Sequence, residues 1–171
     1  MNNQNEILAK LANKLITKLT AIESIAVLFI LTGLILKSFD ISQGRILLLI
    51  SLGTLSLVYF LLAYKSMEPD ASVMVKFLNK LVYWAFSICV VGILFRIQNY
   101  PGYIVMINTG CMTLLLSIVI SVMQKQNLGS KLIIRIIIIA AIGLCLRYTP
   151  KEKLIELKII HPIEKTSNPK Q

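Results

Sequence analysis

The sequence has little of what enzymes and metal sites are built from. It contains one histidine, His161, and three cysteines, Cys89, Cys111 and Cys145, that form no C-x-x-C pair. A lone histidine builds neither a metal site nor a catalytic pair, and isolated cysteines within apolar runs are typical of packing residues. The sequence also has no glycine-rich phosphate loop. We therefore expect no enzymatic activity, no cofactor and no metal.

Charged residues are scarce as well. They make up 15% of the 171 residues, whereas 56% are hydrophobic, and the mean hydropathy is +0.76. A chain of this length leaves much of its surface exposed, so water cannot be the solvent for most of it. The net charge of +10 lies between apolar runs and not in a basic domain. This pattern excludes a disordered chain, a secreted disulfide scaffold and a protein that binds nucleic acid. We expect an all-α integral membrane protein surrounded by the lipid bilayer.

The gaps between charges define the candidate membrane spans, because a charge at the bilayer centre costs about 2.5–3.5 kcal/mol. Four nearly uncharged runs approach the roughly 20 residues that a helical crossing needs. They lie near residues 18–37, 44–65, 76–96 and 102–124. A fifth run, 132–148, is limited by Arg135 and Arg147. Its isoleucines would also suit a buried strand, but in a membrane protein we predict a short fifth span.

The remaining segments complete the predicted organisation. Over residues 1–19, apolar and basic residues lie on opposite faces of a helix, which predicts an amphipathic helix at the membrane surface. An ordinary basic flank explains the same charges equally well. No small-residue cleavage site follows, so we expect this segment to stay attached. Two transmembrane hairpins come next, at 20–66 and 74–124, then the fifth segment and a polar tail at 149–171.

The distribution of lysine and arginine sets the predicted orientation. Nine of these residues belong to the side of the amino terminus and three to the opposite loops. We therefore expect a cytoplasmic amino terminus. Five spans would place the lysine-rich tail outside, whereas a re-entrant fifth segment would return the tail to the cytoplasm.

One acidic residue lies inside a predicted span. Glu23 stands about one turn from the cytoplasmic edge of the first span. Acids within the membrane mark ion and proton pathways, but pairing with Lys18 or solvation at the interface is the simpler explanation. We accordingly expect a Glu23→Gln exchange to leave function intact.

A short motif occurs three times, at residues 33–37, 92–96 and 143–147, each time as a glycine, three further residues and a cation at the end of an apolar run. The first two copies are followed by a short polar turn and a glycine-containing span. This predicts two helical hairpins in the same orientation, followed by a single helix that corresponds to the first half of a third hairpin. The glycines expected to pack helices together are Gly33, Gly53, Gly92, Gly110 and Gly143. The cations expected at the membrane edge, able to reach lipid phosphates or a turn acid, are Lys37, Arg96 and Arg147.

The second copy and its turn, residues 92–102, read GILFRIQNYPG. This segment resembles the G-x-L-F-K-x-x-H-W/F-x-G turn of GldL-type proteins, the inner-membrane motor subunits of bacterial gliding motility and type 9 secretion. The resemblance covers residues 20–124 as two tandem copies of the GldL hairpin and implies a bacterial inner membrane. The sequence departs from the family at three points. The family's histidine is replaced by Asp40 in the first copy and Asn99 in the second, and neither copy has an acidic residue where the family has its motor glutamate. The family's cytoplasmic region also has no counterpart.

These features together predict a non-catalytic multi-pass membrane protein. We expect an assembly or interaction subunit of an inner-membrane complex, with a membrane protein or a second copy of the chain as partner. The alternative is a transport or ion-coupling component of a gliding- or secretion-type motor. Glu23 distinguishes the two, because only the second needs a titratable group in the membrane.

Overall fold

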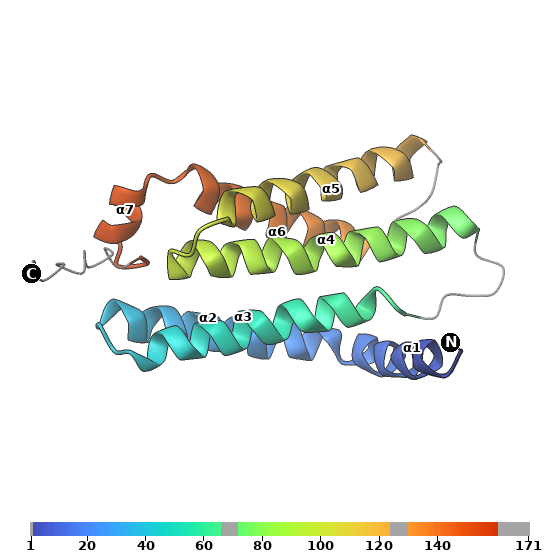
Figure 1. Cartoon of the computed structure of the whole chain (residues 1–171), viewed down its shortest axis with the longest axis horizontal. Helices are drawn as coiled ribbons and strands as arrows, with labels where there is room; N and C mark the ends of the chain where they lie inside the picture. Colours follow the sequence, from blue (N-terminus) through green and yellow to red (C-terminus); the bar gives the residue numbers. More distant parts are fainter. Residues whose placement is uncertain (1, 66–71, 124–129, 161–171) are drawn as a thin grey trace, which may run out of the picture.

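The computed structural model describes residues 2–65, 72–123 and 130–160 (Figure 1). All regular structure in these residues is helical. The elements are α1 (Asn2–Thr17), α2 (Leu19–Ser38), α3 (Gln43–Leu62), α4 (Val73–Gln98), α5 (Tyr103–Met123), α6 (Ser130–Tyr148) and α7 (Lys151–Glu156).

Four of these helices, α2 to α5, are long and apolar enough to cross a membrane. Each begins and ends within three residues of a span that the gaps between charges predicted. This confirms the expectation of an all-helical chain with four candidate spans. Helix α6 is not among the four, because its 19 residues include three cations, Lys131, Arg135 and Arg147.

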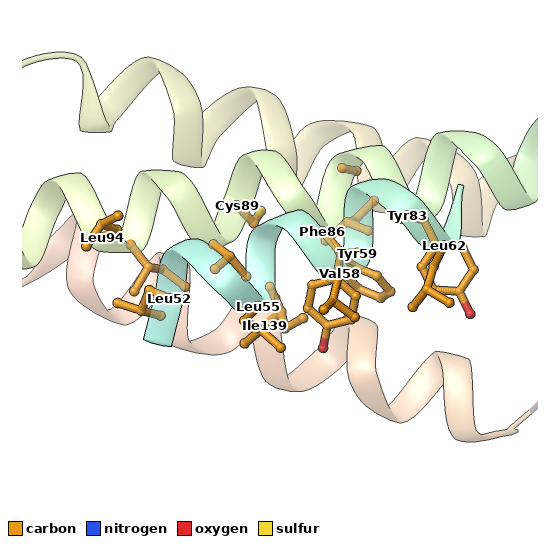
Figure 2. Packing of buried hydrophobic residues seen from close by; sticks show 14 of the residues in the cluster. Leu52, Leu55, Val58, Tyr59, Leu62, Tyr83, Phe86, Cys89, Leu94 and Ile139 are labelled. Atoms are coloured by element: carbon orange, nitrogen blue, oxygen red, sulfur yellow. The ribbon is translucent and has the colours of Figure 1, made fainter. Parts of the chain in front are cut away.

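Helix α4 is at the centre of the bundle and packs against α3, α5 and α6. Of its most apolar stretch, 61% is buried, against 17% for α2. Figure 1 shows α2 behind α3, and α6 behind α4 and α5. In Figure 2, side chains of α3 and α4 interdigitate with Ile139 of α6, so one core joins both hairpins and the sixth helix.

The amino-terminal helix α1 runs on into α2 through a break at Lys18. It keeps roughly the direction of α2 in Figure 1. Ala12 is fully buried, and α1 packs against α3. Ile7 and Leu11 of the predicted apolar stripe are 57% and 47% exposed. Part of the stripe therefore belongs to the bundle and part faces outward.

The turns that close the two hairpins have the same backbone geometry. Asp40 and Asn99 each stand three residues after the motif cation, and each has a φ of 59°. The residue after each one donates its N–H to the carbonyl five residues back, at 3.1 and 2.8 Å. This bond, with a left-handed residue before it, is the usual way to end a helix before a sharp turn. Asparagine and aspartate tolerate that conformation better than other non-glycine residues. The α2–α3 and α4–α5 turns also lie at the same end of the bundle as α7 (Figure 1).

Candidate functional site

A carboxylate and a guanidinium form an ion pair across the bundle. The Nε of Arg135 in α6 lies 2.8 and 3.1 Å from the two carboxylate oxygens of Glu23 in α2, and its Nη2 lies 2.9 Å from the second. The hydroxyl of Tyr59 in α3 donates to the first oxygen at 2.8 Å. Such two-pronged pairs between arginine and carboxylate are the strongest kind of salt bridge. Three helices are thus joined at one carboxylate.

The pair bridges two helices whose backbones do not touch. Among the described residues, no Cα of α2 lies within 8 Å of a Cα of α6. The Arg135 and Glu23 side chains are 19% and 21% exposed, while Tyr59 is only 3% exposed and its ring lies 5.2 Å from that of Phe86. The ion pair therefore links α2 to α6 beside α3, and both charged side chains stay partly exposed.

The partner of Glu23 differs from the expected one. The sequence favoured Lys18, which is exposed at the break between α1 and α2. The packing of α6 in the bundle brings Arg135 to the carboxylate instead. The sequence missed Arg135 and Tyr59 as site residues. The available signal was Arg135 itself, a cation within an apolar run with no neighbouring acid, which calls for a distant partner.

The first two motif cations lie at the opposite end of the bundle and are buried. Lys37 is 2% exposed, and its Nζ donates to the carbonyl of Ile97 at 2.6 Å. Arg96 is 3% exposed. Its Nε donates to the carbonyl of Leu146 at 3.1 Å, and its Nη2 donates to that of Thr149 at 2.7 Å. The expectation that these cations reach lipid phosphates is therefore wrong for both, because neighbouring helices enclose them.

Both cations bond the last carbonyls of another helix. The final turn of a helix leaves carbonyls without partners within the helix and carries partial negative charge. Lys37 of α2 donates to such a carbonyl at the end of α4, and Arg96 of α4 donates to one at the end of α6. Arg96 additionally donates to the hydroxyl of Tyr103 at 2.7 Å, with its guanidinium carbon 4.4 Å from the ring centre. The motif cation thus joins one helix to the next member of the series α2, α4, α6.

The third motif cation behaves differently. Arg147 at the end of α6 is half-buried, and its Nε donates to the side-chain oxygen of Asn108 at 3.3 Å in an exposed position. Its guanidinium carbon lies 5.5 Å from the ring centre of Tyr148. Helix α6 is the last long helix of the described residues, and the bond that Arg147 makes joins it to α5 and not to the short helix α7 that follows.

Polar groups in the middle of the bundle also join helices. The hydroxyls of Ser56 in α3 and Ser87 in α4 lie 2.8 Å apart. The sulfur atoms of Cys89 and Cys111 lie 3.8 Å apart between α4 and α5, both as buried free thiols. Cys145 is exposed on α6. Ser56 and Ser87 therefore bond one helix to another.

The five motif and span glycines fall into two groups. A Cβ at Gly33 would come within 2.9 Å of Leu48, and one at Gly92 within 2.8 Å of Ile107, in both cases fifteen residues further along the chain. A Cβ at Gly110 would overlap the sulfur of Cys89. These glycines let neighbouring helices approach closely. At Gly143 the nearest atom would be 3.4 Å away, an ordinary contact, and at Gly53 there is nothing within 4 Å. The packing role expected of Gly53 is therefore wrong within a single chain, because that face of α3 meets no other helix.

The segment after α6 forms a short helix. The sequence predicted a polar tail from residue 149, but α7 and the turn after it bury two apolar side chains, Leu154 and Ile160, which are 2% and 1% exposed. Residues 161–171, including His161, lie outside the described part of the chain, as do residues 66–71. Within the described ranges, no group of three histidine, cysteine or acidic residues could hold a metal ion.

Comparison of the chain with family models, curated proteins and solved structures finds no match in any of the three. The class of protein therefore follows from the helices alone: four of them are fit to span a membrane.

A charge-pair experiment follows from the Glu23 site. Glu23→Gln and Arg135→Gln should each destabilise the protein by about 1–3 kcal/mol, because each leaves a partly buried group without its hydrogen-bond partner. The double variant should lose less stability than the two single variants lose together, since its second change removes a charge that is already unpaired. Thermal unfolding in mild detergent measures all three. Additive losses would show that the ion pair contributes no coupling. The charge swap of the two residues should recover part of the loss.

Proposed function

We propose that the chain is a non-catalytic multi-pass membrane protein that serves as an assembly or interaction subunit of an inner-membrane complex. One observation carries this proposal. In the described residues, every buried side-chain nitrogen and oxygen has a hydrogen-bond partner. Glu23, Lys37 and Arg96 use theirs to join one helix to another. Polar groups that hold helices together suit a fixed scaffold better than a moving carrier.

The outer surface supports the same proposal. Helix α2 exposes a continuous apolar stripe in which Leu28 is 63% and Ile35 is 57% exposed, and the stripe ends at Phe39, which is 73% exposed. In a bilayer such a face contacts lipid or another transmembrane helix. Since α2 is the least covered of the four candidate spans, it offers the largest surface to a partner.

The finer architecture is part of this proposal. We take α6 as a fifth, short crossing, α1 as a helix that extends from the bundle toward the membrane surface, and the amino terminus as cytoplasmic. The matching turns at Asp40 and Asn99, and the matching contacts of Gly33 and Gly92, support two tandem hairpins. The turn motif supports a GldL-like hairpin in a bacterial inner membrane. Reporter fusions after α7 would report the side of the carboxyl terminus, with an outside location expected.

The assembly role is tested in the native membrane. We expect the tagged, intact protein, extracted in mild detergent after cross-linking in the membrane, to elute as a species larger than a single chain. The matched control is the Gly53→Leu variant, in which leucine fills an open part of the α3 surface. If that control dissociates the species, the α3 face is part of the interface. A single-chain species under all cross-linking conditions would contradict the proposal.

Ion coupling is the second candidate. The observation that favours it is that the Glu23 carboxylate, within a candidate span, keeps 21% of its side chain exposed. The single Glu23→Gln exchange is a poor test, because it also leaves Arg135 unpaired, and the earlier expectation that it is harmless does not allow for this. The double variant Glu23→Gln, Arg135→Gln removes both charges. In proteoliposomes we expect the proton flux of the unaltered protein to equal that of empty vesicles. A flux that the double variant abolishes would favour ion coupling instead.

A further inference from the structure

The motif cations form an ordered series with two open ends. Inside the chain, the cation of α2 bonds the end of α4, and the cation of α4 bonds the end of α6. At one end of this series stands Arg147 of α6, which is followed in the described residues only by the six-residue helix α7 and by no further long helix. At the other end stands the carboxyl end of α2, which has no motif-bearing helix before it. In α4 the carbonyl that accepts from Lys37 belongs to Ile97, one residue after the motif cation. The corresponding residue of α2 is Ser38.

The two open ends are chemically complementary. Arg147 supplies a guanidinium, and the last turn of α2 supplies backbone carbonyls with partial negative charge. The neighbouring surfaces are both apolar. On α6 an exposed stripe includes Ile134 and Ile138, which are 55% and 52% exposed, and ends at Cys145 and Tyr148. The stripe on α2 described above ends at Phe39.

We propose that α2 of a second copy docks against the outer face of α6, so that Arg147 bonds the carbonyl end of that α2. This rests on the proposed assembly role and names the partner as the chain itself. Because α2, α4 and α6 run in the same direction (Figure 1), a second copy in the same membrane orientation presents the carboxyl end of its α2 on the same side of the membrane as that of α6. The contact joins two different surfaces, so copies add in one direction and form a row or a closed ring.

Cys145 makes this contact measurable. It stands two residues before Arg147, and Ile35 stands two residues before Lys37, so the proposed contact brings the two positions to the same depth. A disulfide needs Cα atoms within about 7 Å. No Cα of α2 lies within 8 Å of one of α6 in the described chain, so a link between positions 35 and 145 must join two copies.

The experiment uses two differently tagged full-length chains expressed together. One carries Ile35→Cys and Cys145→Ser, and the other is unaltered. Oxidation of the membranes with copper phenanthroline should give a linked pair that carries both tags. A chain with both Ile35→Cys and the native Cys145 should give a ladder of dimers, trimers and larger species. The matched control replaces Ile35→Cys by Val122→Cys, which is 72% exposed near the other end of the bundle and should not link.

Arg147→Glu should lower the yield of the mixed pair several-fold, because it places a carboxylate beside the carbonyl end of α2. The inference is overturned if only pairs of the unaltered chain form through Cys145, which would indicate a symmetric contact, or if the Val122 control links as well as position 35. It is also overturned if no copies link while the tagged protein still elutes in a complex with a different membrane protein. In that last case the assembly role stands, so the two failures are distinguishable.

Discussion

Gly110→Leu is expected to destabilise the bundle by at least about 3 kcal/mol, the upper end of the range for overpacked cores. Even the first side-chain carbon would overlap the sulfur of Cys89, and it would lie 3.0 Å from the Cys89 nitrogen and 3.2 Å from the Ala85 carbonyl oxygen. Backbone atoms cannot rotate away as a flexible side chain can. Helices α4 and α5 would have to separate, although they form the most extensive helix–helix contact in the described residues. Thermal unfolding in detergent, followed by circular dichroism, measures the loss.

Gly53 provides the matched control for this prediction. It also lies inside a long apolar helix, but a Cβ there would meet nothing within 4 Å. Gly53→Ala should therefore raise stability by up to about 1 kcal/mol, because alanine favours the helix over glycine. Gly110→Ala should lower it. If the two alanine variants shift stability in the same direction, close helix approach is not the reason for the glycine at position 110.

Arg96→Met is expected to cost about 3 kcal/mol. Methionine has a similar length and no charge, but it leaves the carbonyls of Leu146 and Thr149 without their donor in a site where Arg96 is only 3% exposed. Leaving buried acceptors unsatisfied costs about 1–3 kcal/mol each. Loosening should be greatest where α6 meets α7, so hydrogen exchange there should increase together with the fall in unfolding temperature.

Arg147→Met is the control, because Arg147 holds the same motif position on α6. Within one chain it makes a single exposed bond to Asn108, so its replacement should cost less than about 1 kcal/mol in the isolated protein. Equal losses for the two variants would indicate that loss of positive charge, and not loss of the carbonyl bonds, governs the effect.

The residue ranges of the helices could be predicted from the sequence, whereas the contacts between helices could not. Gaps between charges define how deep a residue lies, and the four spans end where charges or turn residues require it. Depth does not say which way a side chain points. Lys37 at the end of a span suits both a lipid phosphate and a helix end, and only the packed bundle decides between them. Gly53 and Gly110 look alike in sequence for the same reason, although a second helix covers only one of them.

The site was predicted in part. Glu23 was identified as the acid within a span, and pairing was preferred to an ion pathway. The partner could not be identified, because Arg135 lies 112 residues away and comes near only when α6 packs beside α4. A pairing rule based on neighbours in the sequence therefore favoured Lys18. Tyr59 carried no signal at all, since tyrosine is common at membrane boundaries.

The separation of Glu23 from Arg135 has a consequence for biogenesis. Chains are synthesised at about 5–20 residues per second, so a separation of 112 residues corresponds to roughly 6–22 s of translation. During that interval α2 must enter the bilayer with its carboxylate still lacking the arginine. The contact between α2 and α6 at Glu23 therefore forms only after the helices between them have been made.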